Sequence, residues 1–314
     1  MGALIARRLL SIIPILLIVT FGVFWLMALV PSDQAEILAG TDATPARVEE
    51  IRHAFGLDQP LLEQYWHWLE DAVQGDLGTS HISQDEVAHE ISQRLPVTVS
   101  LLLAGTFVAL IVGVPLGLVS GMRAGSRADS ATRVYTSLGL AIPEFVLAIL
   151  LVFLVAVQWR LLPTAGYRKF SESPSEWLRF ITLPALSLGL VNGAIISRQL
   201  RASLVDTMDS NYVRAAWARG GTKRTVVGKH AFKNAAMPVV TLLGTQVGFL
   251  IGGTVILEQI FAIPGMGNYL LRAISTQDVQ ALLGATIVFV IFGLFVSLLV
   301  DIAYGFLNPK VRVY

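Results

Sequence analysis

Residues 211–240 read NYVRAAWARGGTKRTVVGKHAFKNAAMPVV, a basic stretch that lies between two strongly apolar stretches. Its first part, residues 211–219, consists of residues that favour a helix, and Gly220 and Gly221 interrupt the run. Thr222 can cap a second helix beyond this break. The stretch therefore predicts a hairpin of two helices rather than an unstructured tether.

The first helix of this hairpin carries small and large residues side by side. The small residues are Ala215 and Ala216, and the large ones are Tyr212 and Trp217. Such a helix can enter a groove on a partner protein. The same basic, amphipathic character also fits a helix that lies on anionic lipid, and the residues alone leave both interpretations open.

The composition of the whole chain indicates a membrane protein. Of its 314 residues 54% are hydrophobic and only 14% are charged, whereas soluble domains have roughly 25% charged residues. The chain contains no cysteine, which excludes disulfides, thiolate metal sites and a thiol nucleophile.

Six apolar runs approach the roughly 20 residues that a helix needs to cross the hydrocarbon core. They predict an all-α integral membrane protein with about six spans: Leu9–Val30, Thr98–Gly121, Val134–Val157, Ile181–Ser197, Pro238–Leu257 and Ala281–Tyr304. The first run is longer than the roughly 7–15 residues of a signal-peptide core, so we interpret it as an uncleaved span.

The basic residues predict the orientation of these spans. With both termini in the cytoplasm, the inside segments hold 15 Lys and Arg against three acids, whereas the outside segment 31–97 holds 13 Asp and Glu against three Arg. Lys and Arg concentrate on the cytoplasmic side of membrane proteins. We therefore expect a stub and first span at 1–30, an acidic extracytoplasmic segment at 31–97, and a core with five spans at 98–314, whose cytoplasmic loop covers 206–237.

The hairpin also carries a recognisable residue order. It runs Tyr-Val-Arg-Ala-Ala-x-Ala-x-Gly from 212 to 220, then Lys-His-Ala-x-Lys-Asn-Ala from 229 to 235, followed by Pro238. This order resembles the cytoplasmic "EAA" loop of ABC importer permeases, and more narrowly the B-type permease subunit of the dipeptide, oligopeptide and nickel transport group. Two features depart from the general motif: Arg214 stands where the motif has Glu, and Pro238 lies farther from Gly220.

The resemblance extends along the chain in the same order. Residues 55–65, with FGLDQPL followed by Gln-Tyr, and residues 75–80, GDLGTS, resemble the outer segment of that group. Near the other end, residues 258–267 and 301–310 match in the same way. Four separated matches are far more specific than any single short pattern.

The resemblance implies a function and a set of partners. It implies a type I ABC importer permease in a bacterial-type inner membrane, paired with a second, related permease subunit and served by an extracytoplasmic substrate-binding protein. One or two separate ATP-binding subunits would hold ATP and Mg, and the substrate would be a dipeptide, a longer peptide or a nickel complex. Contacts with the ATPase would come from Tyr212, Arg214, Ala215, Ala216, Arg219, Gly220, His230 and Asn234. The alternative is a self-sufficient, proton-coupled secondary transporter.

Glycines at four-residue spacing predict close helix packing. They occur in the second and fifth spans, at Gly113, Gly117 and Gly121 and at Gly244, Gly248 and Gly252. A helix face without side chains lets another backbone approach closely where lipid supplies no hydrophobic drive. We expect these faces to serve packing rather than transport.

Three polar residues inside the predicted spans are candidates for the substrate path. Glu144 follows Pro143 near the middle of the third span, where a charge costs about 2.5–3.5 kcal/mol and usually faces a cavity or the bundle interior. Asn192 and Gln246 lie in the fourth and fifth spans. For all three the alternative is a hydrogen bond between helices.

Other chemistry finds no support in the sequence. The phosphate-binding pattern Gly-x-x-x-x-Gly-Lys-Ser/Thr is absent, and 220–223, Gly-Gly-Thr-Lys, lacks its spacing, so ATP hydrolysis must come from another chain. Four of the five histidines lie in the outer segment, and no span offers a pair of metal ligands. We expect no catalytic residue, no bound cofactor and no metal in this chain. Orientation and docking explain the basic cluster better than nucleic acid does.

Overall fold

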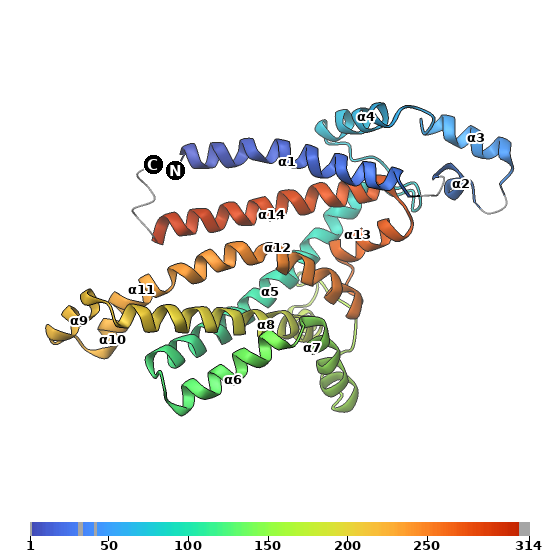
Figure 1. Cartoon of the computed structure of the whole chain (residues 1–314). Helices are drawn as coiled ribbons and strands as arrows, with labels where there is room; N and C mark the ends of the chain where they lie inside the picture. Colours follow the sequence, from blue (N-terminus) through green and yellow to red (C-terminus); the bar gives the residue numbers. More distant parts are fainter. Residues whose placement is uncertain (1, 31–33, 41–42, 308–314) are drawn as a thin grey trace. The chain divides into compact units, whose positions relative to one another are not determined.

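The computed structural model describes residues 2–30, 34–40 and 43–307, with side chains except at 2–9, 223, 230, 245, 247–249 and 303–307. Regular secondary structure in these ranges is helical throughout, which confirms the all-α prediction; an isolated β-bridge joins Thr79 and Glu86. The chain divides into two compact units, and Figure 1 labels the helices that they contain. Unit 1 comprises Met1–Ala3, Thr98–Pro264 and Phe295–Tyr314, and unit 2 comprises Leu4–Val97 and Gly265–Leu294.

Unit 1 contains the helices that follow the acidic segment. They are the greater part of α5 (Val87–Met122), then α6 (Arg127–Ala141), α7 (Glu144–Leu151), the π-helix η1 (Val152–Gln158), α8 (Pro174–Met208), α9 (Asn211–Ala218), α10 (Lys223–Thr225), the π-helix η2 (Val226–Ala231), α11 (Phe232–Ala235) and α12 (Met237–Ile260). Unit 2 contains α1 (Gly2–Ala28), α2 (Gln34–Ala39), α3 (Pro45–Ala54), α4 (Leu61–Val73), α13 (Met266–Ser275) and the first part of α14 (Val279–Leu307).

Helices lie in all six predicted ranges in order, although the third range is divided among α6, α7 and η1. Among the described residues four helices are long and apolar enough to cross a membrane: Leu10–Ala28, Val87–Met122, Pro174–Met208 and Val279–Ile302. The bent pair α6 and α7–η1 would be a fifth. The predicted fifth span lies within α12, whose described apolar part Leu250–Ile260 is shorter than a span.

The third predicted span, Val134–Val157, is wrong as a continuous helix. The chain breaks after α6, and the helices on either side of the break are bent by 101°. The residue before a proline is driven out of the α region, and Ile142 accordingly adopts φ −98° and ψ 117°. Pro143 then precedes the first turn of α7, in which Glu144 is the first residue.

The glycine face of α5 packs against α8, as its spacing predicts. A Cβ atom at Gly113 would lie 2.6 Å from the carbonyl oxygen of Gly193, and one at Gly117 would lie 2.9 Å from that of Ser197. A Cβ at Gly121 would meet Leu204 at 3.0 Å. Backbone atoms of α8 therefore fill the space that side chains on α5 would need.

A second apolar cluster of unit 1 joins the end of α8 to the helices after it. Its buried residues include Leu200 and Leu204 of α8, Val213 and Ala216 of α9, and Val226, Ala231 and Ala235 of η2 and α11. The predicted hairpin is thus a packed structure, which we call the basic hairpin (residues 211–235).

Unit 2 has its own core around α4. Tyr65 and Trp68 are buried together with Phe24 of α1 and Leu283 of α14. The Tyr65 hydroxyl lies 2.9 Å from Oγ1 of Thr20, which ties α4 to α1. In α4 the side chains of Tyr65 and Trp68 are thus buried in protein, whereas Trp66 is exposed.

Candidate functional site

The basic hairpin begins directly after α8 and turns at two glycines. Gly220 has a left-handed φ of +78°, a conformation in which residues with a Cβ are strained. The Gly221 amide donates to the Ala216 carbonyl at 3.2 Å, and the Gly220 amide donates to the Trp217 carbonyl at 2.9 Å. These bonds satisfy the last carbonyls of α9 in the way typical of a glycine-terminated helix. The break predicted at Gly220 and Gly221 is confirmed.

One face of α9 belongs to the hairpin's own core. Val213 is fully buried and Ala216 is 5% exposed, and both contact the cluster that includes Leu204 and Val226. Ala216 therefore packs inside the hairpin, and any contribution it makes to docking is through the hairpin's shape. Gly220 likewise acts through its backbone conformation, because a Cβ there would meet no atom within 4 Å.

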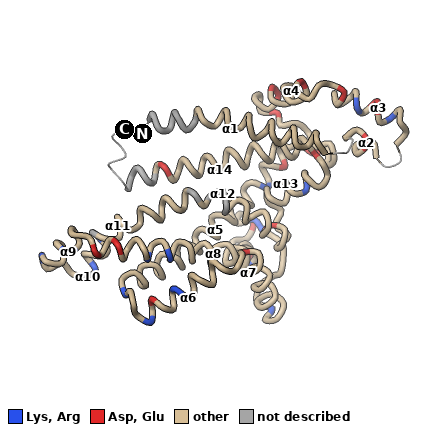
Figure 2. The backbone as a smooth tube through the Cα atoms, in the orientation of Figure 1, with Lys and Arg blue, Asp and Glu red and all other residues tan. Residues whose placement is uncertain are grey.

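The opposite face of α9 is available to a partner. The exposed residues of α9 include Tyr212, Arg214, Ala215 and Trp217, and the exposed Arg219 follows the helix. The Tyr212 hydroxyl accepts a 2.7 Å hydrogen bond from Asn234 Nδ2, which joins α9 to α11. The side chain of His230, also predicted as a contact, lies outside the described residues. Figure 2 shows basic residues along the hairpin and at the nearby helix ends of unit 1.

The polar residues predicted for the path fall at two places in unit 1. Asn192 of α8 and Gln246 of α12 line the same small cavity, with a volume of about 10 Å³. This is room for about one water. Asn192 Nδ2 donates to the Leu188 carbonyl at 2.8 Å, a bond within its own helix. Thr106 also lines the cavity, and the other lining side chains are apolar, such as Ile195 and Leu243.

Glu144 lies elsewhere, where α7 faces α12. Its side chain is half-buried, and its Oε1 occupies the position that a Cβ at Gly253 would take. A Cβ at 253 would therefore force the end of the Glu144 side chain to move aside. The structure brings Asn192 and Gln246 together and places Glu144 at the helix break, outside their cavity.

Two further charged groups of unit 1 were not singled out by the sequence. Glu258, in the last turn of α12, is fully buried and accepts a 2.6 Å hydrogen bond from Thr98 Oγ1. Asp129, at the start of α6, is 1% exposed and pairs with Arg201 of α8. In each case the partners are far apart in sequence, so local patterns give no signal for the pairing.

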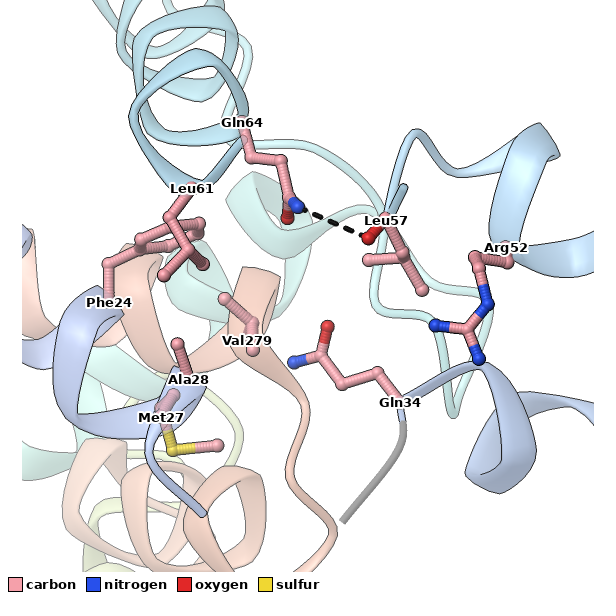
Figure 3. A pocket seen from close by; sticks show the side chains of 9 residues that line it. All are labelled: Phe24, Met27, Ala28, Gln34, Arg52, Leu57, Leu61, Gln64 and Val279. Carbon is pink, nitrogen blue, oxygen red and sulfur yellow. Dashed lines mark hydrogen bonds between the residues drawn. The ribbon is translucent and has the colours of Figure 1, made fainter. Parts of the chain in front are cut away.

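A recess in unit 2 is lined by the acidic segment and its neighbours. Figure 3 shows this cavity of about 280 Å³, which is lined by Phe24, Met27, Ala28, Gln34, Arg52, Leu57, Leu61, Gln64 and Val279. Apolar side chains form one side, and Gln34 and Arg52 extend along the other (Figure 3). Gln64 Nε2 donates to the Leu57 carbonyl at 3.4 Å. Within the described residues no group of three His, Cys, Asp or Glu could hold a metal ion.

Comparison with known proteins identifies the family. The family model described as binding-protein-dependent transport system inner membrane component matches residues 113–313, and the model of the N-terminal part of such components matches residues 1–102. A putative peptide transport system permease protein of Brucella abortus (strain 2308) is 39% identical over 312 residues, 99% of each chain. The glutathione transport system permease protein GsiC of Pectobacterium atrosepticum is 38% identical, covering 98% of this chain and 97% of that protein.

A solved structure shares the fold. The inward-facing MetNI methionine ABC transporter contains a chain that matches with a TM-score of 0.56 at 15% identity, over 69% of this chain and 96% of that one. At this identity the match concerns the fold. Together with the two family models, it agrees with the permease architecture that the sequence motifs imply. The chain belongs to the family of inner-membrane components of binding-protein-dependent transport systems.

Proposed function

We propose that this chain is the permease subunit of an ATP-driven importer of small peptides. The observation that carries the proposal is the basic hairpin, whose inner face is buried in its own core and whose outer face presents Tyr212, Ala215 and Trp217. Because this helix is already folded, it can enter a groove without the loss of conformational entropy that ordering on binding would cost. The peptide class is supported by the names of the full-length relatives, since glutathione is itself a small peptide.

The permease works with partners that supply what it lacks. One or two ATP-binding subunits hold ATP and Mg and receive the hairpin, and the chain itself breaks no bond. A second, related permease subunit completes the path in the inner membrane, with both termini of this chain in the cytoplasm. A substrate-binding protein delivers the peptide to the acidic segment 31–97, where the recess of Figure 3 provides a concave surface.

Glu144, Asn192 and Gln246 are proposed to lie along the substrate path. Glu144 has the strongest case, because it combines a negative charge with a helix break that opens the backbone of α6 and α7. Glu144→Gln should change the substrate preference or the uptake rate of an importer that assembles normally. An unchanged substrate profile would leave the carboxylate a packing role against Gly253.

The decisive experiment is purification of this chain from its native membranes, followed by identification of the attached subunits and reconstitution into liposomes. The complete complex should take up a radiolabelled dipeptide or glutathione when ATP is supplied, and the isolated chain should be inert. Uptake by the isolated chain, driven by a proton gradient, would instead establish a secondary transporter and refute the proposal.

A further inference from the structure

A single buried carboxylate joins several elements of unit 1. Asp129, in the first turn of α6, receives two hydrogen bonds from Arg201 of α8: from Nε to Oδ1 at 2.6 Å and from Nη2 to Oδ2 at 2.9 Å. A planar guanidinium that donates two bonds to one carboxylate fixes the orientation of both groups. Asp129 is 1% exposed, so solvent reaches little of the carboxylate, whereas the Arg201 side chain is 27% exposed.

The same carboxylate accepts two more hydrogen bonds from the end of α5 and the turn that follows it. Ser120 Oγ donates to Oδ1 at 2.5 Å, and the Gly125 amide donates to Oδ2 at 2.9 Å. Arg133, an exposed residue one turn along α6, lies 3.7 Å from Oδ2. We call Asp129, Arg201, Ser120 and the Gly125 amide the Asp129 cluster. It connects α5, the α5–α6 turn, α6 and α8.

Stability alone is a weak explanation for such a cluster. Desolvation of Asp129 costs several kcal/mol, and apolar residues of similar volume often stabilise as well as the ion pair they replace. The ion pair instead specifies the relative orientation of α5, α6 and α8, because its hydrogen bonds form in one arrangement of these helices only. Packing of apolar residues restricts sliding and rotation of helices less than such directional bonds do.

Further contacts extend the attachment of α6 to α8. The Tyr135 hydroxyl donates to the Leu190 carbonyl at 2.7 Å, and a Cβ at Gly139 would lie 2.5 Å from that of Ala194. Two residues beyond Gly139, α6 ends at the 101° break. At its other end α8 leads into the basic hairpin and shares Leu204 with the hairpin's core.

We infer that the Asp129–Arg201 pair is the positioning joint that makes α5, α6 and α8 move as one body when the basic hairpin is displaced. The full displacement of α8 is then transmitted through α6 to the break at Ile142–Pro143. At this break α7, which carries Glu144, reorients relative to α6. Without the Asp129–Arg201 pair, α8 would slide past α6, and α7 would not follow the movement of the basic hairpin. This inference rests on the proposed docking of the hairpin to an ATPase.

The test uses the complete complex, purified with its ATPase and second permease subunit. Asp129→Asn and Arg201→Lys should retain the ATPase subunit and basal ATP hydrolysis, but lower dipeptide uptake per ATP hydrolysed by about tenfold, within the range measured for residues that transmit coupling. Arg133→Gln is the matched control, because it removes the exposed neighbour and leaves the cluster intact. Its uptake per ATP should equal that of the original chain.

A rescue distinguishes a joint from a folding requirement. Since the chain has no cysteine, Asp129→Cys with Arg201→Cys can be bridged selectively by a short bis-methanethiosulfonate reagent. The bridge should restore uptake per ATP to within about twofold of the original chain. Three results would each overturn the inference: unchanged coupling in Asp129→Asn, loss of assembly in all the variants, or inhibition by the bridge. A purified original complex without any ATPase subunit would instead refute the proposed function.

Discussion

Glu144 and Gly253 illustrate how one residue's missing side chain makes room for its neighbour. The carboxylate of Glu144 occupies the space of a Cβ at 253, whereas a Cβ at Gly252 would meet no atom within 4 Å. Two consecutive glycines of α12 therefore have different requirements. Only at Gly253 would a Cβ displace another side chain of unit 1.

This difference predicts different effects of the same substitution. Gly253→Ala should lower the stability of the purified chain by about 0.5–1.5 kcal/mol, the cost of moving the end of the Glu144 side chain out of its present rotamer. Gly252→Ala should be neutral or slightly stabilising, since alanine favours a helix more than glycine does. Thermal unfolding of the two variants in detergent measures both effects. Equal melting temperatures would show that the Glu144 carboxylate is free to move.

We expect His81 to make unit 2 sensitive to acid, for the following reason. Its ring packs edge-on against the ring of Phe55, with 4.6 Å between the ring centroids. Burial lowers the pKa of His81, and the negative charge of Asp278 partly offsets this shift. In the unfolded chain histidine takes up a proton at about pH 6.5. The unfolded state therefore binds more protons as the pH falls below that value, and the stability of the folded state decreases.

We predict that replacing His81 reduces this acid sensitivity. Thermal unfolding of His81→Gln should depend less on pH between about 8 and about 5.5 than that of the original chain. His89→Gln, which changes an exposed histidine of α5, serves as the control and should keep the original dependence. A His81 variant that is as acid-sensitive as the control would assign the effect to other groups.

At the scale of elements, α9 has two faces with different tasks. Ala216 faces the hairpin core and Ala215 faces outward, one residue away. The helical period places them about 100° apart, so the same enlargement at each position affects a different interface. Substitutions at Ala215 and Ala216 can therefore distinguish an effect on docking from an effect on the folding of the hairpin.

Leucine at these two positions should have distinguishable consequences. Ala216→Leu overfills the core and should cost about 1–3 kcal/mol of stability. Ala215→Leu should leave the melting temperature unchanged and abolish co-purification of the ATPase, because the added bulk blocks entry into a close-fitting groove. Retention of the ATPase by Ala215→Leu would show that the exposed face of α9 is not the docking surface.

Elements whose determinants are local in sequence could be predicted. The glycine face of α5 and the break at Gly220 depend on spacing and backbone preference, and both are confirmed. The bend after Ile142 was missed, although Pro143 carried the signal, because the apolar run continues through it. The Asp129–Arg201 pair could not be predicted, since 72 residues separate its members and many other pairings satisfy the same charges.

At the scale of the whole molecule, charge asymmetry is the basis for the proposed orientation. Acidic residues occur on α2, α3 and α4 of unit 2, whereas the turns and hairpin of unit 1 are rich in Lys and Arg (Figure 2). Positive charge retained in the cytoplasm would place the hairpin inside and the acidic segment outside.

Labelling of single cysteines tests this orientation, because the natural chain has none. A membrane-impermeant maleimide should label Ser83→Cys and Ser171→Cys in intact cells stripped of their outer layers. It should label Ala124→Cys and Arg224→Cys only after the membrane is opened. Labelling of Arg224→Cys in intact cells would reverse the orientation and remove the hairpin from the ATPase side.

The contact between α5 and α8 also restricts the natural variation that this chain can accept. At Gly113 and Gly117 the obstructing atoms include main chain of α8, which no rotamer change can withdraw. Suppose that codons 103, 107, 113 and 117 are randomised and the library is selected for growth on a peptide as nitrogen source. Positions 113 and 117 should then retain glycine. The exposed positions 103 and 107 of the same helix, now Leu and Phe, should accept various apolar residues. Tolerance of substitution would then vary along α5 with the helical repeat.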